Sequence, residues 1–191
     1  MKLSKLERIF VNFTAKWRNI KTTERLFNYI DLDKVEKVLE IGCGIGTLSA
    51  YLADKYKWKV TGIDLDPEQI EKTKEYHRES EYLKFIESDA IKLPFENNEF
   101  NMVLSFDVLH HIPNRDKALD EINRVLKSDG FHILVDFAFP RLFGKFSISL
   151  DDIINQMERN NFKIIYQKKP KVITGWRFSI MFQKSSNDYY K

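Results

Sequence analysis

Short apolar runs alternate with segments of helical periodicity along most of the chain. The apolar runs are rich in β-prone residues and lie at residues 35–41, 59–63, 82–86, 100–106 and 131–137. The segments between them repeat apolar residues every three or four positions, most clearly at residues 47–55, 67–80 and 114–127. Strands that alternate with helices predict an α/β fold in which a mostly parallel sheet carries helices on both faces.

Capping residues support the helix assignments. Asp66 stands before Pro67, and a capping acid followed by proline is typical of a helix start. Asn114 precedes a segment whose apolar residues would form one face of a helix. The sequence KSDG, which ends at Gly130, predicts a helix stop before the fifth strand.

The pattern changes after the fifth strand. The sequence SISLDDIINQMERNNF predicts a last helix that starts near Ser149. Two apolar runs, KIIYQKK and WRFSIMFQK, then follow without a helical segment between them. Adjacent strands without a crossover helix are expected to pair antiparallel.

Length and composition indicate one soluble domain over residues 1–191. The chain has 191 residues, of which 43% are hydrophobic, and this suits one core. No apolar run approaches the roughly 20 residues that span a bilayer, and the N-terminus lacks a secretory apolar region. Cys43 is the single cysteine, so we expect a cytoplasmic protein without a disulfide, and no cluster of residues predicts a metal site.

The charge is unevenly distributed. Residues 1–25 and 163–191 together carry 14 Lys and Arg against 3 Asp and Glu, whereas the middle of the chain is acidic. One interpretation is that the two ends are solvated peripheral segments. The other is that both ends converge beside the active site and attract an anionic substrate.

The stretch EIGCGIGT, residues 40–47, joins a predicted strand to a predicted helix. Its glycines at 42, 44 and 46 would make a tight turn and let a ligand approach the backbone. A dinucleotide-binding turn needs its third glycine at position 47, where this chain has Thr47. Glu40 would also repel a pyrophosphate, so the turn favours a ligand that carries a cation.

Acidic residues follow the next strands. Asp64 comes about 20 residues after the glycines, at the spacing where such folds hold a carboxylate against ribose hydroxyls. Asp89 follows the third strand, and SFDVLHH follows the fourth. Because ligands bind at the carboxyl ends of strands in open α/β sheets, we expect a nucleoside site there.

Four stretches resemble the successive motifs of class I S-adenosylmethionine-dependent methyltransferases, and most closely the methyltransferase type 11 group, which includes ubiquinone and menaquinone biosynthesis enzymes. The stretches are VLEIGCGIG, VTGIDLDPEQI, ESDAIKLPFENNEFNMVLSFDVLHHI and LDEINRVLKSDGFHILVDF. The resemblance runs from about Val35 to Asp136. It implies a Rossmann-like sheet of seven strands in the order 3-2-1-4-5-7-6, with strand 7 antiparallel.

The resemblance also implies a cofactor, S-adenosylmethionine, whose product is S-adenosylhomocysteine, and roles for individual residues. Glu40 and the backbone of the turn would hold the methionine end, Asp64 would bind both ribose hydroxyls, and Asp89 would accept from the adenine amine. Cys43 is interpreted as a buried space-filler. The full set of expected cofactor-binding residues is Glu40, Gly42, Cys43, Gly44, Asp64, Leu65, Asp89, Ala90 and Phe106.

A general base matters only if the methyl acceptor must lose a proton. The candidates are Asp107, His110, His111 and Asp136, of which His110 and His111 are the predicted catalytic residues. In the other interpretation, the two histidines form a helical turn against the cofactor. The acceptor is not identified by the sequence, but the dozen residues between strand 5 and the last helix leave no room for an inserted substrate domain.

Residues 1–30 predict a helix with one apolar stripe. Its apolar residues recur at spacings of three and four, and basic residues occupy the other faces. The segment would be a lid over the cofactor, a packing element at the sheet edge, or a helix that rests on a membrane surface. The stripe consists of Leu3, Leu6, Phe10, Phe13, Trp17 and Ile20.

We therefore expect methyl transfer to a small molecule or lipid-like metabolite. The alternatives are methylation of RNA or protein through the basic terminal segments, and a protein that binds S-adenosylmethionine without catalysis. Nucleic acid is a possible partner only in the first alternative, and no transmembrane segment is expected.

Overall fold

The computed structural model describes residues 18–138, 149–169 and 177–185. Residues 18–26 are helical and lead into two short 3-10 turns, η1 (Phe27–Tyr29) and η2 (Leu32–Lys34). The remaining elements are β1 (Lys37–Ile41), α2 (Thr47–Tyr56), β2 (Lys59–Asp64), α3 (Pro67–Tyr76), β3 (Leu83–Glu87), β4 (Phe100–Phe106), η3 (Leu109–His111), α4 (Arg115–Val125), β5 (Leu126–Phe137), α5 (Leu150–Arg159), β6 (Phe162–Lys168) and β7 (Arg177–Lys184).

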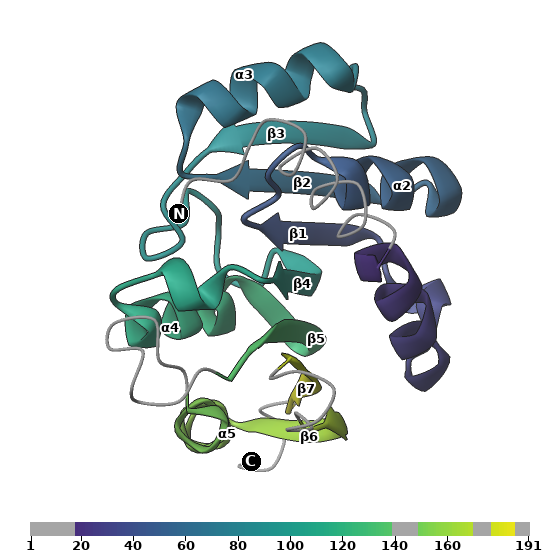
Figure 1. The fold of residues 1–191 in the computed structure, drawn as a ribbon. Coiled ribbons are helices and arrows are strands. Elements are labelled where there is room, and N and C mark those ends of the chain that lie inside the picture. The colour runs from purple at the N-terminus through teal and green to yellow at the C-terminus, as the bar shows by residue number, and fades with distance from the viewer. Residues whose placement is uncertain (1–17, 139–148, 170–176, 186–191) are drawn as a thin grey trace.

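The strands form one sheet of seven, in the order β3-β2-β1-β4-β5-β7-β6 (Figure 1). Strands β1 to β5 pair in parallel with their neighbours, and β7 pairs antiparallel with both β5 and β6. The predicted fold class, strand order and antiparallel strand 7 are confirmed. The parallel strands bring their carboxyl ends to one edge of the sheet, which is where the glycine turn and the acidic residues lie.

Helices cover both faces of the sheet (Figure 1), and an apolar cluster lies on each face. One contains the buried faces of α4 and α5, including Ile122 and Met157. The other contains residues of α2 and α3, including Leu52 and Ile70. Because the central strands are buried on both faces, their sequences read as continuous apolar runs.

The N-terminal segment is part of the second cluster. Ile20, Leu26 and Phe27 are buried in it. The other members of the predicted apolar stripe, Leu3, Leu6, Phe10, Phe13 and Trp17, lie outside the described residues. Packing of residues 20–27 is therefore observed, whereas the predicted lid remains a prediction.

Helix starts were predicted correctly. Asp66 Oδ1 accepts hydrogen bonds from the amides of Glu68 and Gln69 at 3.0 and 3.3 Å, and Asn114 caps α4 through the amide of Lys117. Ser149 caps α5 through the amide of Asp152 at 3.2 Å. Each side chain satisfies an amide that has no partner inside its own helix.

Two helix ends were predicted wrongly. Helix α3 stops at Tyr76 instead of residue 80, because His77 is extended and its ring nitrogen lies 3.0 Å from the carbonyl oxygen of Ile45. Helix α4 stops at Val125 instead of residue 127, and β5 already begins at Leu126. The predicted helix stop at KSDG is also wrong, since those residues belong to β5.

A distant side chain satisfies carbonyl groups at the end of α4. The ammonium group of Lys184 donates to the carbonyl oxygens of Asn123 and Leu126 at 2.8 and 2.7 Å. Carbonyls at a helix end need such donors, and a lysine supplies them here in place of a glycine turn.

Candidate active site

The glycine turn follows β1 and is held rigidly by its neighbours. The amide of Gly44 donates to Asp64 Oδ2 at 2.9 Å, and the carbonyl of Gly44 accepts from Thr73 Oγ1 at 2.7 Å. Gly44 has a φ of +52°, and a Cβ placed on it would meet no atom within 4 Å. A Cβ on Gly42 would lie 2.5 Å from Val108 Cγ2. The turn therefore requires glycine for its backbone at Gly44 and for its packing at Gly42.

Asp64 ends β2 beside this turn. Its Oδ2 accepts from Gly44 and its Oδ1 accepts from the amide of Asp66 at 3.1 Å. A carboxylate has about four lone-pair positions, so two remain for a ligand. Asp64 thus orders the glycine turn, a role that the sequence did not suggest, and still has acceptors for hydroxyl groups.

Glu40 is a buried carboxyl group on β1. Ser49 Oγ donates to Glu40 Oε2. Burial raises the pKa of Glu40 to about 7, and the negative charge of Asp64 adds to this rise, whereas the hydrogen bond from Ser49 opposes it. A cation placed beside Glu40 would favour its ionised form.

A cavity of about 660 Å³ lies at the carboxyl ends of β1, β2 and β4. Its walls are mostly apolar. Three carboxylates line it, Asp64, Asp89 and Asp107, and Asp107 is paired with Arg177. Among the predicted site residues it contains Gly42, Asp64, Leu65, Asp89 and Ala90. An apolar cavity with acceptors at two places suits a nucleoside base and its sugar.

A smaller cavity of about 190 Å³ adjoins it and shares Gly42. The predicted residues Glu40, Cys43, Gly44 and Phe106 line it. The structure thus brings all nine predicted cofactor-binding residues to two adjoining cavities. It adds Asn19 and Gln69 to the smaller one, which sequence reasoning missed. The nearest signal for Gln69 was its place in the first turn after Pro67, and no signal pointed to Asn19.

Cys43 is buried in the glycine turn, consistent with a space-filling role. Its Sγ lies 3.8 Å from the carbonyl oxygen of Gly44. Burial raises the pKa of the Cys43 thiol strongly, and the charges of Glu40 and Asp64 raise it further. The thiol therefore stays protonated and is a poor nucleophile.

His110 and Asp136 form a pair beside the larger cavity. Asp136 ends a buried part of β5, and its Oδ1 lies 2.6 Å from His110 Nδ1. Its Oδ2 also accepts from the backbone amide of His110 at 3.3 Å. The carboxylate assigns the ring proton to Nδ1, so Nε2 is the basic nitrogen of His110.

His111 lies next to this pair and lines the larger cavity. Its ring centroid is 3.9 Å from that of His110. Burial lowers the pKa of His111, the neighbouring His110 lowers it further, and Asp136 and Asp107 act in the opposite direction. His111 is therefore neutral near pH 7.

The two basic ends of the chain meet at Asp107. Arg177 donates to Asp107 through Nε at 3.0 Å and through Nη2 at 2.9 Å, and Arg18 Nη2 lies 3.4 Å from the same carboxylate. Arg177 Nη2 also donates to Asn19 Oδ1 at 2.7 Å. Asp107 has a φ of +54° and faces the larger cavity. Convergence of the ends beside the site is observed for Arg18 and Arg177.

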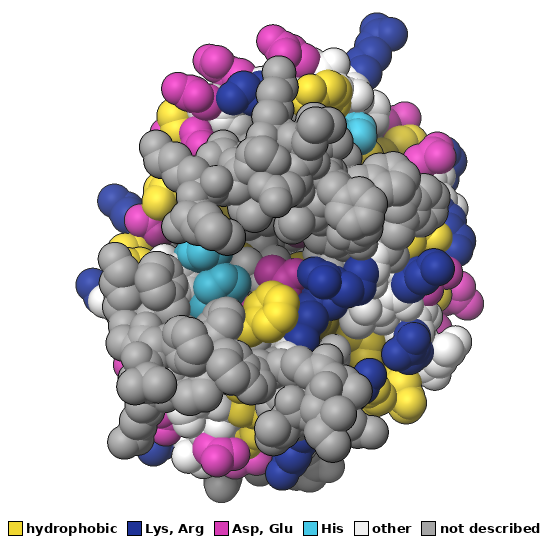
Figure 2. All heavy atoms as spheres, viewed as in Figure 1, with side chains coloured by type: hydrophobic (Ala, Val, Ile, Leu, Met, Phe, Trp, Pro, Cys, Tyr) yellow, Lys and Arg dark blue, Asp and Glu magenta, His cyan; other side chains and the backbone are white. Residues whose placement is uncertain are grey.

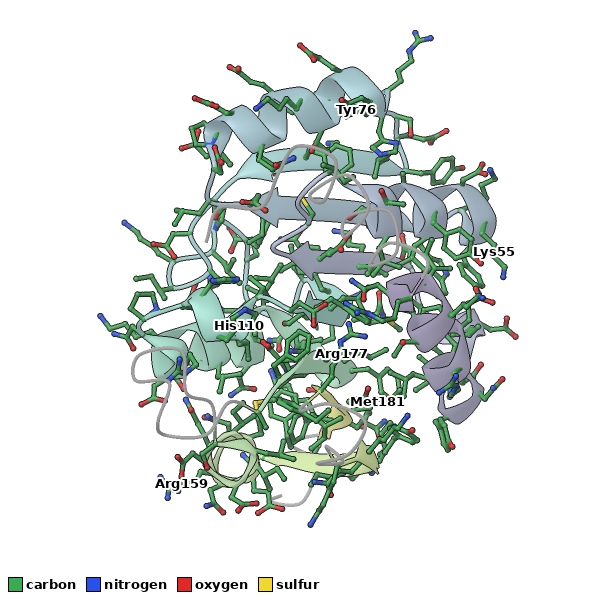
Figure 3. All side chains as sticks on the ribbon, in the orientation of Figure 1. Lys55, Tyr76, His110, Arg159, Arg177 and Met181 are labelled. Atoms are coloured by element: carbon green, nitrogen blue, oxygen red, sulfur yellow. The ribbon has the colours of Figure 1, made fainter. Side chains whose placement is uncertain are left out.

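These groups lie on one face of the molecule. Figure 2 shows histidine, acidic, basic and apolar side chains gathered near the middle of this face. His110, from η3, and Arg177, from the start of β7, lie in this same region (Figure 3). The ring of Phe137 lies between them, 6.2 Å from the His110 ring centroid and 5.9 Å from Arg177 Cζ.

Within the described ranges, no group of three or more His, Cys, Asp or Glu side chains is arranged to hold a metal ion. In the same part of the chain, no helix is long and apolar enough to cross a membrane.

A family model described as a methyltransferase domain matches residues 39–134, which is half of the chain. The matched range includes the carboxylates that line the two cavities, which are Glu40, Asp64, Asp89 and Asp107. The chain belongs to this methyltransferase family. S-adenosylmethionine is the cofactor of the class I methyltransferases that the sequence motifs resemble.

Relatives and solved structures agree with this membership. The chain is 32% identical over 128 residues to 2-methyl-6-phytyl-1,4-hydroquinone methyltransferase from Synechocystis, a match that covers 67% of this chain and 37% of that one. It is 29% identical to demethylmenaquinone methyltransferase from Staphylococcus aureus, over 96% of this chain and 74% of that one. A crystal structure of the (4+2)-cyclase SpnF has a TM-score of 0.74 at 18% identity, covering 86% of this chain and 80% of that one, and it shows the fold alone.

This methyltransferase chain spans less than half of the first of these relatives and about three quarters of the second. The cavities fit S-adenosylmethionine in their chemistry. The larger, apolar cavity suits adenosine, and the smaller one joins it at Gly42 and offers a carboxyl group for an ammonium group. An amide nitrogen of Gln69 in the smaller cavity is also buried without a hydrogen-bond partner, as expected of a group that meets a ligand.

Proposed function

We propose that this chain transfers a methyl group from S-adenosylmethionine to a small, lipid-like acceptor whose hydroxyl group His110 deprotonates. The observation that carries the proposal is the His110–Asp136 pair at 2.6 Å, which lies on the turn that also forms a wall of the larger cavity. We also propose that the nine cofactor-binding residues predicted from the sequence bind S-adenosylmethionine, because they line the two cavities.

When bound, S-adenosylmethionine supplies a methyl group that its sulfonium already activates. Methyl transfer to a hydroxyl-bearing acceptor releases one proton, whether the methyl group goes to the oxygen or to a ring carbon made nucleophilic by deprotonation of that hydroxyl. His110 Nε2 would take that proton. Asp136 would hold the ring and stabilise the imidazolium that forms. A positioned base of this kind contributes about 10²- to 10⁴-fold to a rate.

His111 is proposed as a neutral neighbour of this base. Its pKa is lowered, first by burial and then by His110. A neutral His111 places no second positive charge 3.9 Å from the ring that would carry the proton in the proposed step.

The acceptor class rests on relatives and on the surface beside the base. The two relatives named above act, by their names, on a phytyl hydroquinone and on demethylmenaquinone, both ring compounds with an apolar chain. Phe137 offers an aromatic ring next to His110, which suits such a compound. Arg18 and Arg177, two basic residues that an RNA would meet beside the site, are engaged by Asp107.

The test uses methyl-labelled S-adenosylmethionine with separate pools of metabolites and lipids, RNA, and peptides. We expect label in the metabolite and lipid pool, and we expect His110→Ala and Asp136→Asn to lower the rate by about 10²- to 10⁴-fold with little change in cofactor affinity. His111→Asn is the comparison, with a smaller loss expected.

Label in RNA or peptide would contradict the small-molecule acceptor. A larger loss in His111→Asn than in His110→Ala would contradict the assignment of the base. A protein that binds the cofactor and labels no pool would support the non-catalytic alternative.

A further inference from the structure

The smaller cavity contains a side-chain amide that no protein group satisfies. Gln69 lies in the first turn of α3, and its Nε2 is buried without a hydrogen-bond partner. Its backbone amide is already held by the cap residue Asp66. A buried donor without a partner costs about 1–3 kcal/mol, so such a group is expected to meet a ligand. Gln69 lines the cavity together with Glu40 and the glycine turn.

A second amide reaches the same cavity from the N-terminal helix. Asn19 Oδ1 accepts from Arg177 Nη2 at 2.7 Å, and a guanidinium group can only donate. The oxygen of Asn19 must therefore face Arg177, which leaves Nδ2 as the group that it offers elsewhere. No hydrogen bond of Asn19 Nδ2 occurs within the described part of the chain, and Asn19 lines the smaller cavity. The two amides come from segments 50 residues apart in sequence.

The charges in this cavity explain why two neutral donors matter. Glu40 is the only Asp, Glu, Lys or Arg among the described residues that line it. An amino-acid group needs acceptors for its ammonium and donors for its carboxylate. Glu40 can supply the first. Among the described residues, the side-chain donors that this cavity offers for the carboxylate are neutral.

We propose that the amides of Asn19 and Gln69 together bind the α-carboxylate of the amino-acid end of the cofactor. This inference rests on the cofactor assignment and is independent of the acceptor and of His110. Arg177 is a positioning residue in this arrangement. Asp107 holds its guanidinium through two hydrogen bonds, at 3.0 and 2.9 Å, and Arg177 in turn orients Asn19.

Binding calorimetry with two ligands tests the proposal. S-adenosylhomocysteine carries the amino-acid group, whereas 5′-methylthioadenosine has the same nucleoside and sulfur without it. We expect Gln69→Leu and Asn19→Leu each to weaken S-adenosylhomocysteine binding by about ten- to a hundredfold, as for a hydrogen bond to a charged group, and to leave methylthioadenosine binding unchanged within about twofold.

Gln167→Leu is the matched control. Gln167 Nε2, on β6, is also buried without a partner, but Gln167 lines neither cavity. Its replacement should change neither affinity. Arg177→Met should reproduce the selective loss of Asn19→Leu, because the freed amide of Asn19 can rotate. The unliganded Gln69→Leu protein should be at least as stable to urea as the wild type, since an unsatisfied buried donor has been removed.

Equal loss of both ligands in the Gln69 and Asn19 variants would overturn the proposal, because the residues would then act on the nucleoside or on the fold. Unchanged S-adenosylhomocysteine affinity would overturn it as well. Failure of the wild type to bind S-adenosylhomocysteine would overturn the cofactor assignment on which it rests. Absence of methyl transfer in a protein that keeps the predicted selectivity would count only against the proposed function.

Discussion

Glu40 is a buried carboxyl group that the proposed complex would place beside an ammonium group. Its carboxyl group is buried, and burial raises its pKa to about 7. An ammonium group beside it would stabilise the ionised form and lower that pKa. Binding is therefore coupled to release of a proton wherever the free protein still carries one on Glu40.

This coupling predicts a pH dependence of cofactor affinity. Below pH 7 Glu40 is mostly protonated in the free protein, so S-adenosylhomocysteine binding should weaken by up to about tenfold per pH unit. Above pH 7 the affinity should be nearly constant until the ligand's own ammonium group loses its proton. Calorimetry at pH 6, in buffers that differ in their heat of ionisation, should show that close to one proton is released for each S-adenosylhomocysteine molecule bound. Methylthioadenosine, which lacks the ammonium group, should show no release, and a release with both ligands would assign the proton to another group.

Asp64 has two functions in the structure, and its replacement should affect both. Asp64→Ala removes the acceptor for the Gly44 amide and the proposed acceptor for ribose hydroxyls. We expect S-adenosylhomocysteine and methylthioadenosine to lose about 1.5–3 kcal/mol of binding free energy alike, measured by calorimetry.

Ser149→Ala is the control for Asp64→Ala. Ser149 caps α5 and lines neither cavity, so its loss should lower the free energy of unfolding by about 1 kcal/mol and leave both affinities nearly unchanged. Unchanged affinity in Asp64→Ala would place the ribose elsewhere.

Helix α4 passes directly into strand β5 without a glycine turn. A lysine from β7 donates to the carbonyl groups at this junction. The Lys184 ammonium bonds two carbonyls at the helix end, and partial burial lowers its pKa. Lys184→Met should lower the free energy of unfolding by about 1–3 kcal/mol, because it leaves these carbonyls without their donor. Urea titration would measure this, and Lys163→Met, an exposed lysine on the adjacent strand, should have little effect. Equal stability of the two variants would mean that water replaces Lys184.

The N-terminal helix combines packing with a contribution to the site. Removing residues 1–21 takes away buried Ile20 and the proposed ligand Asn19, but the strands begin at Lys37 and Leu26 and Phe27 remain in the core. We expect a folded sheet by circular dichroism, a loss of about 1.5–3 kcal/mol in the free energy of unfolding, and reduced preference for S-adenosylhomocysteine over methylthioadenosine. Global unfolding would show that this helix is an essential part of the core.

Local signals, namely apolar periodicity, caps and turn residues, predicted the alternating strands and helices of the sheet. The strand order and the nine cofactor-binding residues were implied by the resemblance to class I methyltransferases, and the structure has that order and places those nine residues at the two cavities. The sequence did not predict the place of Asn19 in the site or the roles of Arg177 and Lys184. Each of these side chains bonds to a residue more than 50 positions away in the sequence, and local patterns carry no signal of such contacts. The sequence pattern also misplaced the end of α4. Gln69 was near a recognised motif, but its unsatisfied amide appears only in the folded chain.

The whole account depends on one cofactor molecule filling two cavities that share Gly42. A crystal structure of the chain with S-adenosylhomocysteine tests this most directly. We predict adenosine in the 660 Å³ cavity, with its ribose on Asp64 and its adenine near Asp89, and the amino-acid group in the 190 Å³ cavity against Glu40, Asn19 and Gln69. A ligand bound outside these cavities, or with its amino-acid group directed away from Glu40, would contradict it.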